Sequence, residues 1–360
     1  MHRGRARRRG RFQISEFGIK ELNTQELKNG AMRNSARDRS LFLNSRVLEC
    51  LSASRMSVLV VGSIGIDSIK TQLEERRDVL GGAASYASIG ASFFAPVKLV
   101  GIVGSDFPQE YIELFKSRGI NLDGVQVADG KTFRWSGEYE WDMNQRKTLN
   151  LALNVFENFT PKLPDAYRRA PIILLGNISP ILQYHVLDQV EDPRFVIADT
   201  MDLWITTTRP ELLDLLKRVD LLVLNDSEAR QLTAETSLIK AGRAILQLGP
   251  RFVAIKKGEH GCLLLSQDQF FSCGAFPLED IHDPTGAGDS FAGGFAGYLA
   301  SLEKESFEFA DLKKAVVYGS LMASFCVESF SLDRIKALSR EEIEERYELF
   351  RLMSHFEVIE

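Results

Sequence analysis

The chain has 360 residues, enough for two ordinary domains or one large α/β domain. Hydrophobic residues make up 44% of it and charged residues 26%, as in ordinary globular proteins. The net charge is -5, and no apolar run approaches the roughly 18–20 residues of a membrane span, so we expect neither nucleic acid nor a membrane as a partner.

Residues 1–55 form a basic extension, with 13 Lys and Arg against 5 Asp and Glu. Met56 stands directly before the first clear strand. We therefore expect the extension to be a disordered tail, or residues added by an upstream start codon. A basic targeting leader is a second interpretation, because such leaders are rich in Arg and Ser. A nucleic-acid-binding arm is a third.

From Met56 onward, short apolar runs alternate with helical patterns. Continuous Val, Ile and Leu runs are typical of parallel strands that are covered on both faces. The alternation predicts a doubly wound α/β sheet, in which ligands bind beyond the carboxyl ends of the strands. The predicted strands are 57–62, 97–104, 171–178, 195–200, 221–225, 252–256 and 262–265. The predicted helices are 82–94, 109–118, 210–218, 238–248 and 312–327.

Residues 124–160 interrupt this alternation. Aromatic side chains at Phe133, Trp135, Tyr139 and Trp141 stand among many polar residues, and SGEYEWDMN alternates as a two-faced strand does. We interpret the region as a β excursion outside the main sheet. It is either a surface hairpin with its own apolar face or a lid over a substrate site.

The four cysteines indicate neither a zinc site nor a disulfide framework. Cys50, Cys262, Cys273 and Cys326 form no C-x-x-C pair, and no His cluster accompanies them. Reduced and mostly buried thiols are the better interpretation, and they predict a cytoplasmic protein.

The stretch DPTGAGDSFAGGFAGYLA, which begins at Asp283, carries the clearest chemistry. Gly286, Ala287 and Gly288 have little side chain, so their N–H groups at a helix start can approach an anion closely. Asp289 follows within reach of that anion and can accept the proton of an attacking hydroxyl. The alternative is that Asp289 only complements the helix dipole and that the glycines allow close helix packing.

Several motifs, in order along the chain, resemble the PfkB carbohydrate kinase family, which has the ribokinase-like fold. DPTGAGD resembles the C-terminal signature of that family, and VLVVGSIGID resembles its first strand with the substrate-binding acid. LGGAASYASIGASFF resembles the N-terminal signature region, NDSE the N-x-x-E motif, and KKGEHG the nucleotide-binding glycine turn.

The resemblance covers about residues 56–340 and implies a kinase domain of the α/β class. Its fold would be a doubly wound, mostly parallel sheet flanked by helices, with a small β lid. The lid would come from about residues 67–80 and 124–160. Residues 341–360 would then be a C-terminal helix and tail.

The resemblance also implies an ATP-dependent kinase that transfers the γ-phosphoryl group. It makes Asp289 the catalytic base and the segment 286–288 the anion hole. Asp283 and Thr285 match a monovalent-cation site of many members, so K⁺ is a candidate cofactor beside ATP and Mg²⁺.

On the substrate side, an acid and two glycines stand out. Asp67 comes just after a buried strand and is expected to hold two substrate hydroxyls, although capping a turn is the alternative. Gly81 and Gly82 open the next helix in the resembling region. Asn177 ends another strand and is a candidate pocket residue.

The NDSE motif has two interpretations. Asn225 followed by Glu228 is typical of a capping box at a helix start. The resemblance implies instead that both residues organise Mg²⁺, which commonly keeps several waters and binds few protein groups directly.

The KKGEHG turn is the candidate nucleotide loop. Gly258 and Gly261 are expected around ATP, with Lys256 or its neighbour near a phosphate; a solvated turn is the alternative. By analogy with the family, Ala323 and Val327 flank the adenine, although apolar helix positions usually belong to the core.

The substrate half departs from the sugar kinases of the family. Many of them carry a Lys after the paired glycines and an Asn three residues further on, where this chain has Ala83 and Tyr86. Ile178 stands where some have a polar residue. A Tyr offers one hydroxyl and a large ring, so Tyr86 or the lid aromatics could stack on a nucleobase.

These departures leave the acceptor open. We expect transfer to a hydroxymethyl group of a sugar, with a nucleoside (adenosine-like) kinase as the alternative. A non-catalytic nucleotide-binding regulator of the same fold is the second alternative. Lids of this family sometimes pair, so a homodimer through the lid is a further expectation.

Overall fold

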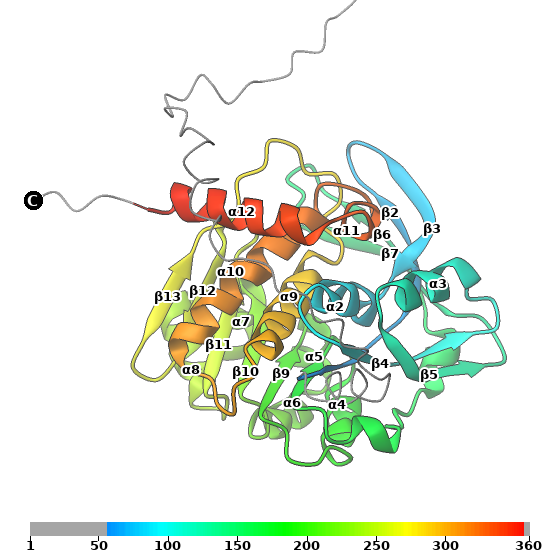
Figure 1. Cartoon of the computed structure of the whole chain (residues 1–360), viewed down its shortest axis with the longest axis horizontal. Coiled ribbons are helices and arrows are strands. Elements are labelled where there is room, and N and C mark those ends of the chain that lie inside the picture. The colour runs from blue at the N-terminus through cyan, green and yellow to red at the C-terminus, as the bar shows by residue number, and fades with distance from the viewer. Residues whose placement is uncertain (1–55, 356–360) are drawn as a thin grey trace, which may run out of the picture. The chain divides into compact units, whose positions relative to one another are not determined.

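The computed structural model describes residues 56–355, and the basic extension discussed above lies outside them. A nine-stranded sheet forms the centre of the molecule (Figure 1). Its strands are β1 (Val58–Val61), β4 (Val97–Gly104), β5 (Asn121–Ala128), β8 (Ile172–Leu175), β9 (Phe195–Asp199), β10 (Leu221–Asn225), β11 (Phe252–Lys256), β12 (Cys262–Leu265) and β13 (Phe270–Cys273).

The spatial order of the sheet is β13-β12-β11-β10-β9-β8-β1-β4-β5. Neighbouring strands run parallel from β5 to β11, and only the pairs β11–β12 and β12–β13 are antiparallel. The predicted doubly wound, mostly parallel sheet is therefore confirmed. All seven strands expected from apolar runs are present in it.

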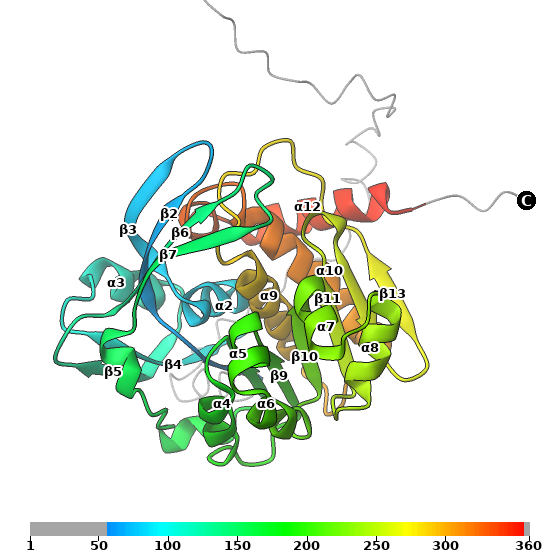
Figure 2. The same cartoon turned by 180° about the vertical axis from the view of Figure 1, so that it is seen from behind.

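Helices cover both faces of this sheet, as the two opposite views show (Figures 1 and 2). Side chains of β1 alternate between the two layers, because successive residues of a strand point to opposite faces. Val58 and Val60 belong to the core cluster with α2, α9 and α10. Leu59 and Val61 belong to the cluster beneath α4, α6 and α8. The helices are α2 (Ala83–Ser92), α3 (Gln109–Ser117), α4 (Pro180–Leu187), α5 (Asp202–Thr207), α6 (Arg209–Leu216), α7 (Asp226–Thr233), α8 (Leu238–Leu246), α9 (Ala287–Ser301), α10 (Phe309–Cys326), α11 (Asp333–Lys336) and α12 (Arg340–Met353).

A second, four-stranded sheet stands beside the carboxyl end of β1, and we call it the small sheet. Its strands are β2 (Gly65–Lys70), β3 (Glu75–Gly81), β6 (Phe133–Tyr139) and β7 (Arg146–Ala152), in the order β3-β2-β6-β7. The expectation that 124–160 lies wholly outside the main sheet is wrong for its first residues. β5 pairs in parallel with β4 and forms the edge of the large sheet, where Leu122 and Val125 pack against the core.

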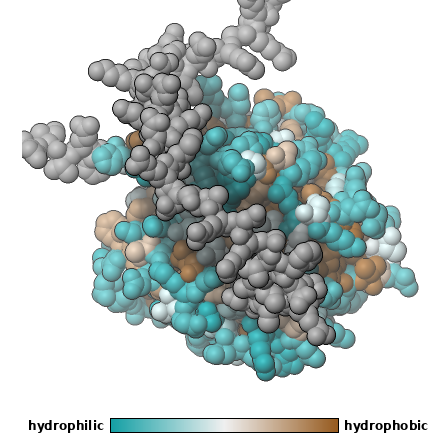
Figure 3. All heavy atoms as spheres, viewed as in Figure 1, coloured by the Kyte–Doolittle hydropathy of each residue, from teal (hydrophilic) through white to brown (hydrophobic). Residues whose placement is uncertain are grey.

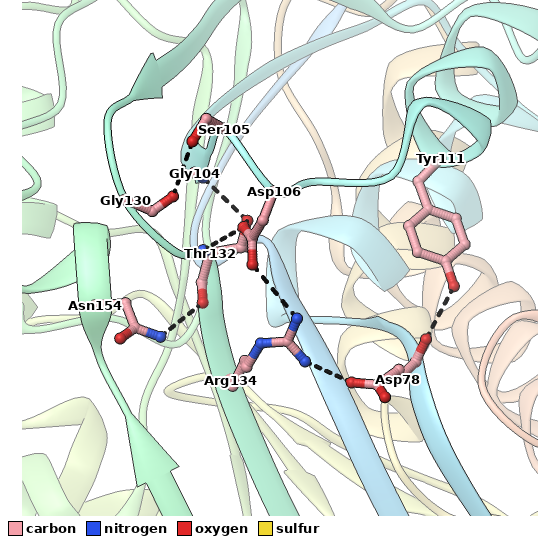
Figure 4. Close-up of polar contacts among 9 residues, drawn as sticks. All are labelled: Asp78, Gly104, Ser105, Asp106, Tyr111, Gly130, Thr132, Arg134 and Asn154. Atoms are coloured by element: carbon pink, nitrogen blue, oxygen red, sulfur yellow. Dashed lines mark hydrogen bonds and ion pairs between the residues drawn. The ribbon is translucent and has the colours of Figure 1, made fainter.

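A polar cluster ties the small sheet to the large one (Figure 4). Thr132 is fully buried, and both its N–H and its hydroxyl donate to Asp106 Oδ1 at 2.7 Å. The Thr132 hydroxyl accepts from Gly104 N at 3.0 Å. Arg134 of β6 pairs with Asp106 and also with Asp78 of β3. These contacts fix the base of the small sheet against the carboxyl end of β4.

Helix α12 belongs to the same core as the rest of the chain. Ile343 and Phe350 are buried in the cluster that contains α9 and α10. The Cζ atom of Arg346 lies 3.5 Å from the centroid of the Phe325 ring, and the guanidinium forms an ion pair with Glu328. The C-terminal helix expected from residue 341 onward corresponds to α12, and this helix packs into the main core.

The face drawn in Figure 3 is mostly hydrophilic where grey atoms do not cover it, with hydrophobic residues scattered over it. Among the helices between residues 56 and 355, none is long and apolar enough to cross a membrane. The buried apolar residues instead form the two clusters on either side of the sheet.

Candidate active site

Polar side chains gather where four neighbouring parallel strands end. Because parallel strands present their carboxyl ends at one edge of a sheet, residues that follow different strands meet there. Asn177 follows β8, Asp199 ends β9, Asn225 ends β10 and Lys256 ends β11. The start of α9 reaches the same edge, since a methyl group built on Gly288 would lie 2.8 Å from Lys256 Nζ.

The glycines at the start of α9 form a candidate anion-binding site, which we call the anion cradle. Gly286 has φ +76° and ψ 0°, a left-handed conformation that glycine adopts without strain. No hydrogen-bond acceptor within residues 56–355 is found for the backbone N–H of Gly286 or of Gly288. Free N–H groups at a helix start, next to an ammonium group, suit a phosphate.

Asp289 lies in the first turn of α9, directly after this cradle. Its pKa is raised to about 6, chiefly by removal from water and in part by the neighbouring carboxylate of Asp199. The positive charges of Lys256 and Arg146 oppose that rise. A carboxylate with a pKa near neutrality is suited to accept a proton as a general base.

Lys256, rather than its neighbour in the sequence, is the lysine at the centre of the site. Its side chain is 18% exposed, and its Nζ lies 3.5 Å from Asp199 Oδ1. Burial alone would lower the pKa of Lys256, but Asp199, Glu228 and Asp289 together raise it. The ammonium therefore stays charged beside the anion cradle.

Asn225 and Glu228 form the predicted capping box. Asn225 Oδ1 accepts from Glu228 N at 2.8 Å, and Glu228 Oε2 accepts from Asn225 N at 2.7 Å. Burial raises the pKa of Glu228 to about 7, with Lys256 opposing the shift and Asp199 adding to it. The helix cap holds both side chains at the end of β10.

The site fits Mg²⁺ held mainly by water and phosphate oxygens. The part of the chain from 56 to 355 contains no group of three or more His, Cys, Asp or Glu that could hold a metal alone. Glu228 Oε1 makes no hydrogen bond to those residues, so it remains open to a hydrated cation. Mg²⁺ commonly uses one or two carboxylates together with waters and substrate phosphates.

Asp67 projects from β2 of the small sheet toward the same centre. It is 4% exposed, and its Oδ1 has no hydrogen-bond partner among the described residues. Burial raises its pKa to about 8, helped by the charges of Asp283 and Asp289. Gly81 leaves it room, because a methyl group there would overlap the carboxyl group. A buried, unpaired carboxyl oxygen fits a ligand hydroxyl.

The paired glycines place α2 close to the first strand. Gly82 is the N-cap of α2 with φ +90°, and a methyl group on it would lie 2.5 Å from the carbonyl oxygen of Ser63. Gly81 and Gly82 therefore matter for the space they leave, and the side chain beside them with an unpaired oxygen is that of Asp67.

Tyr86 lies beneath the anion cradle. It is 1% exposed, and its ring occupies the space where a side chain on Gly286 would stand. In this conformation the ring has no free face, which does not fit the expectation that Tyr86 stacks on a nucleobase. Its position supports Gly286 from below.

Trp135 is the aromatic residue beside Asp67. The two residues are directly paired between the parallel strands β2 and β6, so they share one face of the small sheet. The indole is half-buried, donates to Thr148 Oγ1 at 3.2 Å and lies over Gly137. Sequence reasoning listed Trp135 only among the lid aromatics, since its pairing with Asp67 depends on strand register.

Asp283 and Thr285 are part of the frame of the signature loop. Asp283 is fully buried; its Oδ1 accepts from Thr285 N at 2.8 Å and its Oδ2 from Ser331 N at 3.0 Å. The Thr285 hydroxyl donates to Tyr139 Oη at 3.1 Å. These bonds join α9, the segment before α11 and the small sheet; a monovalent-cation role remains a prediction.

The remaining candidates lie around this centre. Gly258 and Gly261 have φ +54° and +82°, so the turn after β11 depends on glycine. The carbonyl oxygen of Val327, which follows α10, accepts from His282 N at 2.8 Å, and Ala323 is half-buried one turn earlier. Asn177 is already engaged, since its Oδ1 accepts from Trp204 Nε1 at 2.8 Å.

Asp199 is the main residue that sequence reasoning missed. The sequence did contain an indication of this residue. Asp199 is the one acid in the predicted strand 195–200, and it stands near the carboxyl end of that strand, as Asn225 does in the strand 221–225. It is 5% exposed and pairs with Lys256. Its place among the candidate site residues follows from that contact, which the sequence does not show.

Comparison with known proteins gives consistent matches over this region. A model of the pfkB family carbohydrate kinases matches residues 55–336. A cytidine kinase of Thermococcus kodakarensis is 30% identical over 249 residues, 68% of this chain and 88% of that protein. A nucleoside kinase of Methanothermobacter thermautotrophicus is 29% identical over 264 residues, 72% of this chain and 81% of that protein.

Solved structures agree on the fold. The structure of Arabidopsis thaliana ribokinase complexed with ribose and ATP superposes with a TM-score of 0.65 at 22% identity, covering 81% of this chain and 99% of that one. The chain therefore belongs to the pfkB family of carbohydrate kinases and has the ribokinase-like fold.

Proposed function

We propose that this kinase transfers the γ-phosphoryl group of ATP to the hydroxymethyl group of a nucleoside. The observation that carries the transfer reaction is the meeting of Asp289, the cradle of Gly286 and Gly288, and Lys256 at one edge of the sheet. The acceptor class rests on separate support, given below.

Each side chain has a defined task in this proposal. Asp289 accepts the proton of the attacking hydroxyl, and the N–H groups of Gly286 and Gly288 hold the charge of the transferred group. Lys256 adds a fixed positive charge. Asn225 and Glu228 orient the waters of Mg²⁺, which, bound with ATP, neutralises phosphate charge during transfer.

Three observations favour a nucleoside as the acceptor. The cytidine kinase and the nucleoside kinase above are similar to this chain over most of their own length. Trp135 offers a half-exposed indole beside Asp67, where a base attached to a bound ribose could stack. Ala83 and Tyr86 replace the Lys and Asn that many sugar kinases of the family carry.

A free sugar is the second candidate acceptor. Asp67 can bind the two hydroxyls of a ribose whether or not a base is attached, and the fold is shared with a ribokinase that binds ribose and ATP. A non-catalytic regulator has less support, because the base, the cradle and the lysine are all retained.

A substrate panel tests both parts of the proposal. ATP consumption with Mg²⁺ and K⁺ is measured on pyrimidine and purine nucleosides and on ribose and fructose, for the wild type, Asp289→Asn and Trp135→Ala. We expect turnover on a nucleoside, a loss of several orders of magnitude in Asp289→Asn, and a raised KM for the nucleoside in Trp135→Ala. Turnover on sugars alone would overturn the acceptor class, and near-normal turnover in Asp289→Asn would remove the proposed base.

A further inference from the structure

Asp199 and Lys256 lie on the face of the large sheet that α9 covers. Asp199 of β9 is paired with the strand neighbour Val223 of β10. Two residues further along β10, Asn225 is paired with Lys256 of β11. Directly paired residues share one face of a sheet, as do residues two apart in one strand. Val223 belongs to the core cluster that contains α9, so the side chains of Asp199 and Lys256 meet across β10 on the α9 side.

The backbone that carries Asp199 is fixed by Gln183 of α4. Gln183 is fully buried, and its Nε2 donates to the carbonyl oxygens of Asp199 and Gly176, each at 2.9 Å. Gly176 directly follows β8, so one side-chain amide ties the carboxyl ends of β8 and β9 together. In addition, Asp199 Oδ1 accepts from Thr200 N at 3.0 Å. The backbone and the carboxylate of Asp199 are thus both held in place by the protein itself.

Lys256 stands between two acids of the site. Its ammonium lies 3.5 Å from Asp199 Oδ1, and Asp199 is the one acid in ion-pair contact with it among residues 56–355. The same ammonium lies 2.8 Å from the position of a methyl group on Gly288, the residue before Asp289. A largely buried ammonium needs a counter-charge. Without Asp199, the carboxylate of Asp289 would be drawn into that pairing.

A carboxylate that is paired with an ammonium is a poor general base. The pairing lowers its pKa and occupies the oxygen that must accept the proton. Glu228 is the third acid whose charge reaches Lys256, but its Oε2 already accepts from Asn225 N in the capping box. The ammonium belongs at the anion cradle, where its charge faces the phosphate. The site therefore needs a further acid that pairs with Lys256 and leaves the base alone.

We propose that Asp199 is a positioning residue, which pairs with Lys256, holds the ammonium at the anion cradle and leaves the carboxylate of Asp289 free to accept the proton of the acceptor. No bond to Asp199 forms or breaks. The proton of the attacking hydroxyl passes to Asp289, and Lys256 keeps its own protons. The inference rests on the kinase reaction of the proposed function but not on the identity of the acceptor.

The first test compares Asp199→Asn with the matched control Asp220→Asn. Asp220 directly precedes β10, at the opposite end of the same strand, and pairs with Arg251 at 3.1 Å. On the acceptor that the substrate panel identifies, Asp199→Asn should lower kcat about 10- to 100-fold, as a partial loss of the general base. The KM for that acceptor should change less than about threefold, because Asp67 is untouched. Asp220→Asn should keep kcat within about twofold of the wild type.

The pH dependence of kcat is a readout that a merely structural role would not move. In the wild type the acidic limb should follow Asp289, whose pKa of about 6 reflects burial first and then the charge of Asp199. Removing that negative charge lowers the pKa of Asp289, so in Asp199→Asn the limb should move to lower pH while kcat above it falls. A reduced kcat with an unmoved limb would overturn the proposal. The other groups that face Asp289 are the same in both proteins: Lys256 of β11, Arg146 of β7, Asp67 of β2 and Cys326 of α10.

The effect of Asp199→Asn should also depend on Lys256. In Lys256→Met there is no lysine to be released toward Asp289, so we expect Asp199→Asn to change kcat less than about twofold in that background. An equal loss in both backgrounds would mean that Asp199 does not act through Lys256, and the proposal would fail. The comparison holds even if Asp199→Asn alone folds poorly, because neither Lys256→Met nor the double variant leaves this buried ammonium unpaired.

Crystal structures of the wild type and of Asp199→Asn decide the point without an acceptor. In the variant, the ammonium of Lys256 should leave residue 199 and come within ion-pair distance of Asp289, whereas the wild type should keep the pair with Asp199. An ammonium that stays beside residue 199 in the variant would overturn the proposal. If no acceptor on the panel is turned over, the proposed function fails, while these structures still decide the role of Asp199.

Discussion

Asp67 is the residue whose burial has the clearest consequence for stability. Its pKa is about 8 in the folded protein, chiefly through burial, against an ordinary value of 3.8. Below pH 3.8 both the folded and the unfolded chain hold the proton. Between about pH 4 and 8 the unfolded chain releases it while the folded protein retains it, so the free energy of unfolding falls by up to about 1.4 kcal/mol per pH unit.

Asp67→Asn should remove this contribution. We expect the difference in free energy of unfolding between the variant and the wild type to shift in favour of the variant from pH 5 to pH 8, as measured by urea denaturation. The exposed Asp129→Asn is the control and should show no such shift. A constant difference between Asp67→Asn and the wild type across that range would contradict the assigned environment.

At the scale of elements, the attachment of the small sheet decides where Asp67 stands. Thr132 is fully buried. Its hydroxyl donates a hydrogen bond to Asp106 and accepts one from the Gly104 N–H (Figure 4). Thr132→Val keeps the shape but leaves the Gly104 N–H unpaired, which should cost about 1–3 kcal/mol of stability. Because the small sheet carries Asp67, we also expect a raised KM for the acceptor.

Thr132→Ser is the matched control for this prediction. It keeps the hydroxyl and should therefore preserve both the unfolding free energy and the KM far better than Thr132→Val. If both variants behave alike, the hydroxyl is not what anchors the small sheet.

At the scale of the whole molecule, α12 completes the core. Ile343 and Phe350 are 0% and 5% exposed, and each buried side chain of this kind contributes about 1.5–3 kcal/mol. A chain ending after Leu338 should therefore lose several kcal/mol, a large share of the stability of an ordinary domain. Urea denaturation measures the loss, and a chain ending after His355 is the control. Equal midpoints would mean that the domain ends near residue 340.

Sequence patterns predicted the strands of the parallel sheet well and short polar elements poorly. β1 and β8 are apolar throughout, and β9 and β10 are apolar up to the polar residue that ends each of them, since helices cover both faces of these strands. α7 went unpredicted as a helix because its residues, DSEARQLT, are mostly polar and short; only its capping box was visible. β5 was assigned to the excursion because its half-exposed edge position weakens the apolar signal.

The sequence by itself determined the family, the class of fold and the chemistry of the signature loop, because those depend on local order: small residues at a helix start, followed by an acid. Only the tertiary structure decided which side chains share the site. Strand register sets Trp135 beside Asp67 and Arg146 beside Tyr139, and packing puts Tyr86 beneath Gly286. Contacts between strands far apart in the chain leave no periodic trace in the sequence, so Asp199 and Lys256 become a pair only when β9 and β11 stand on either side of β10.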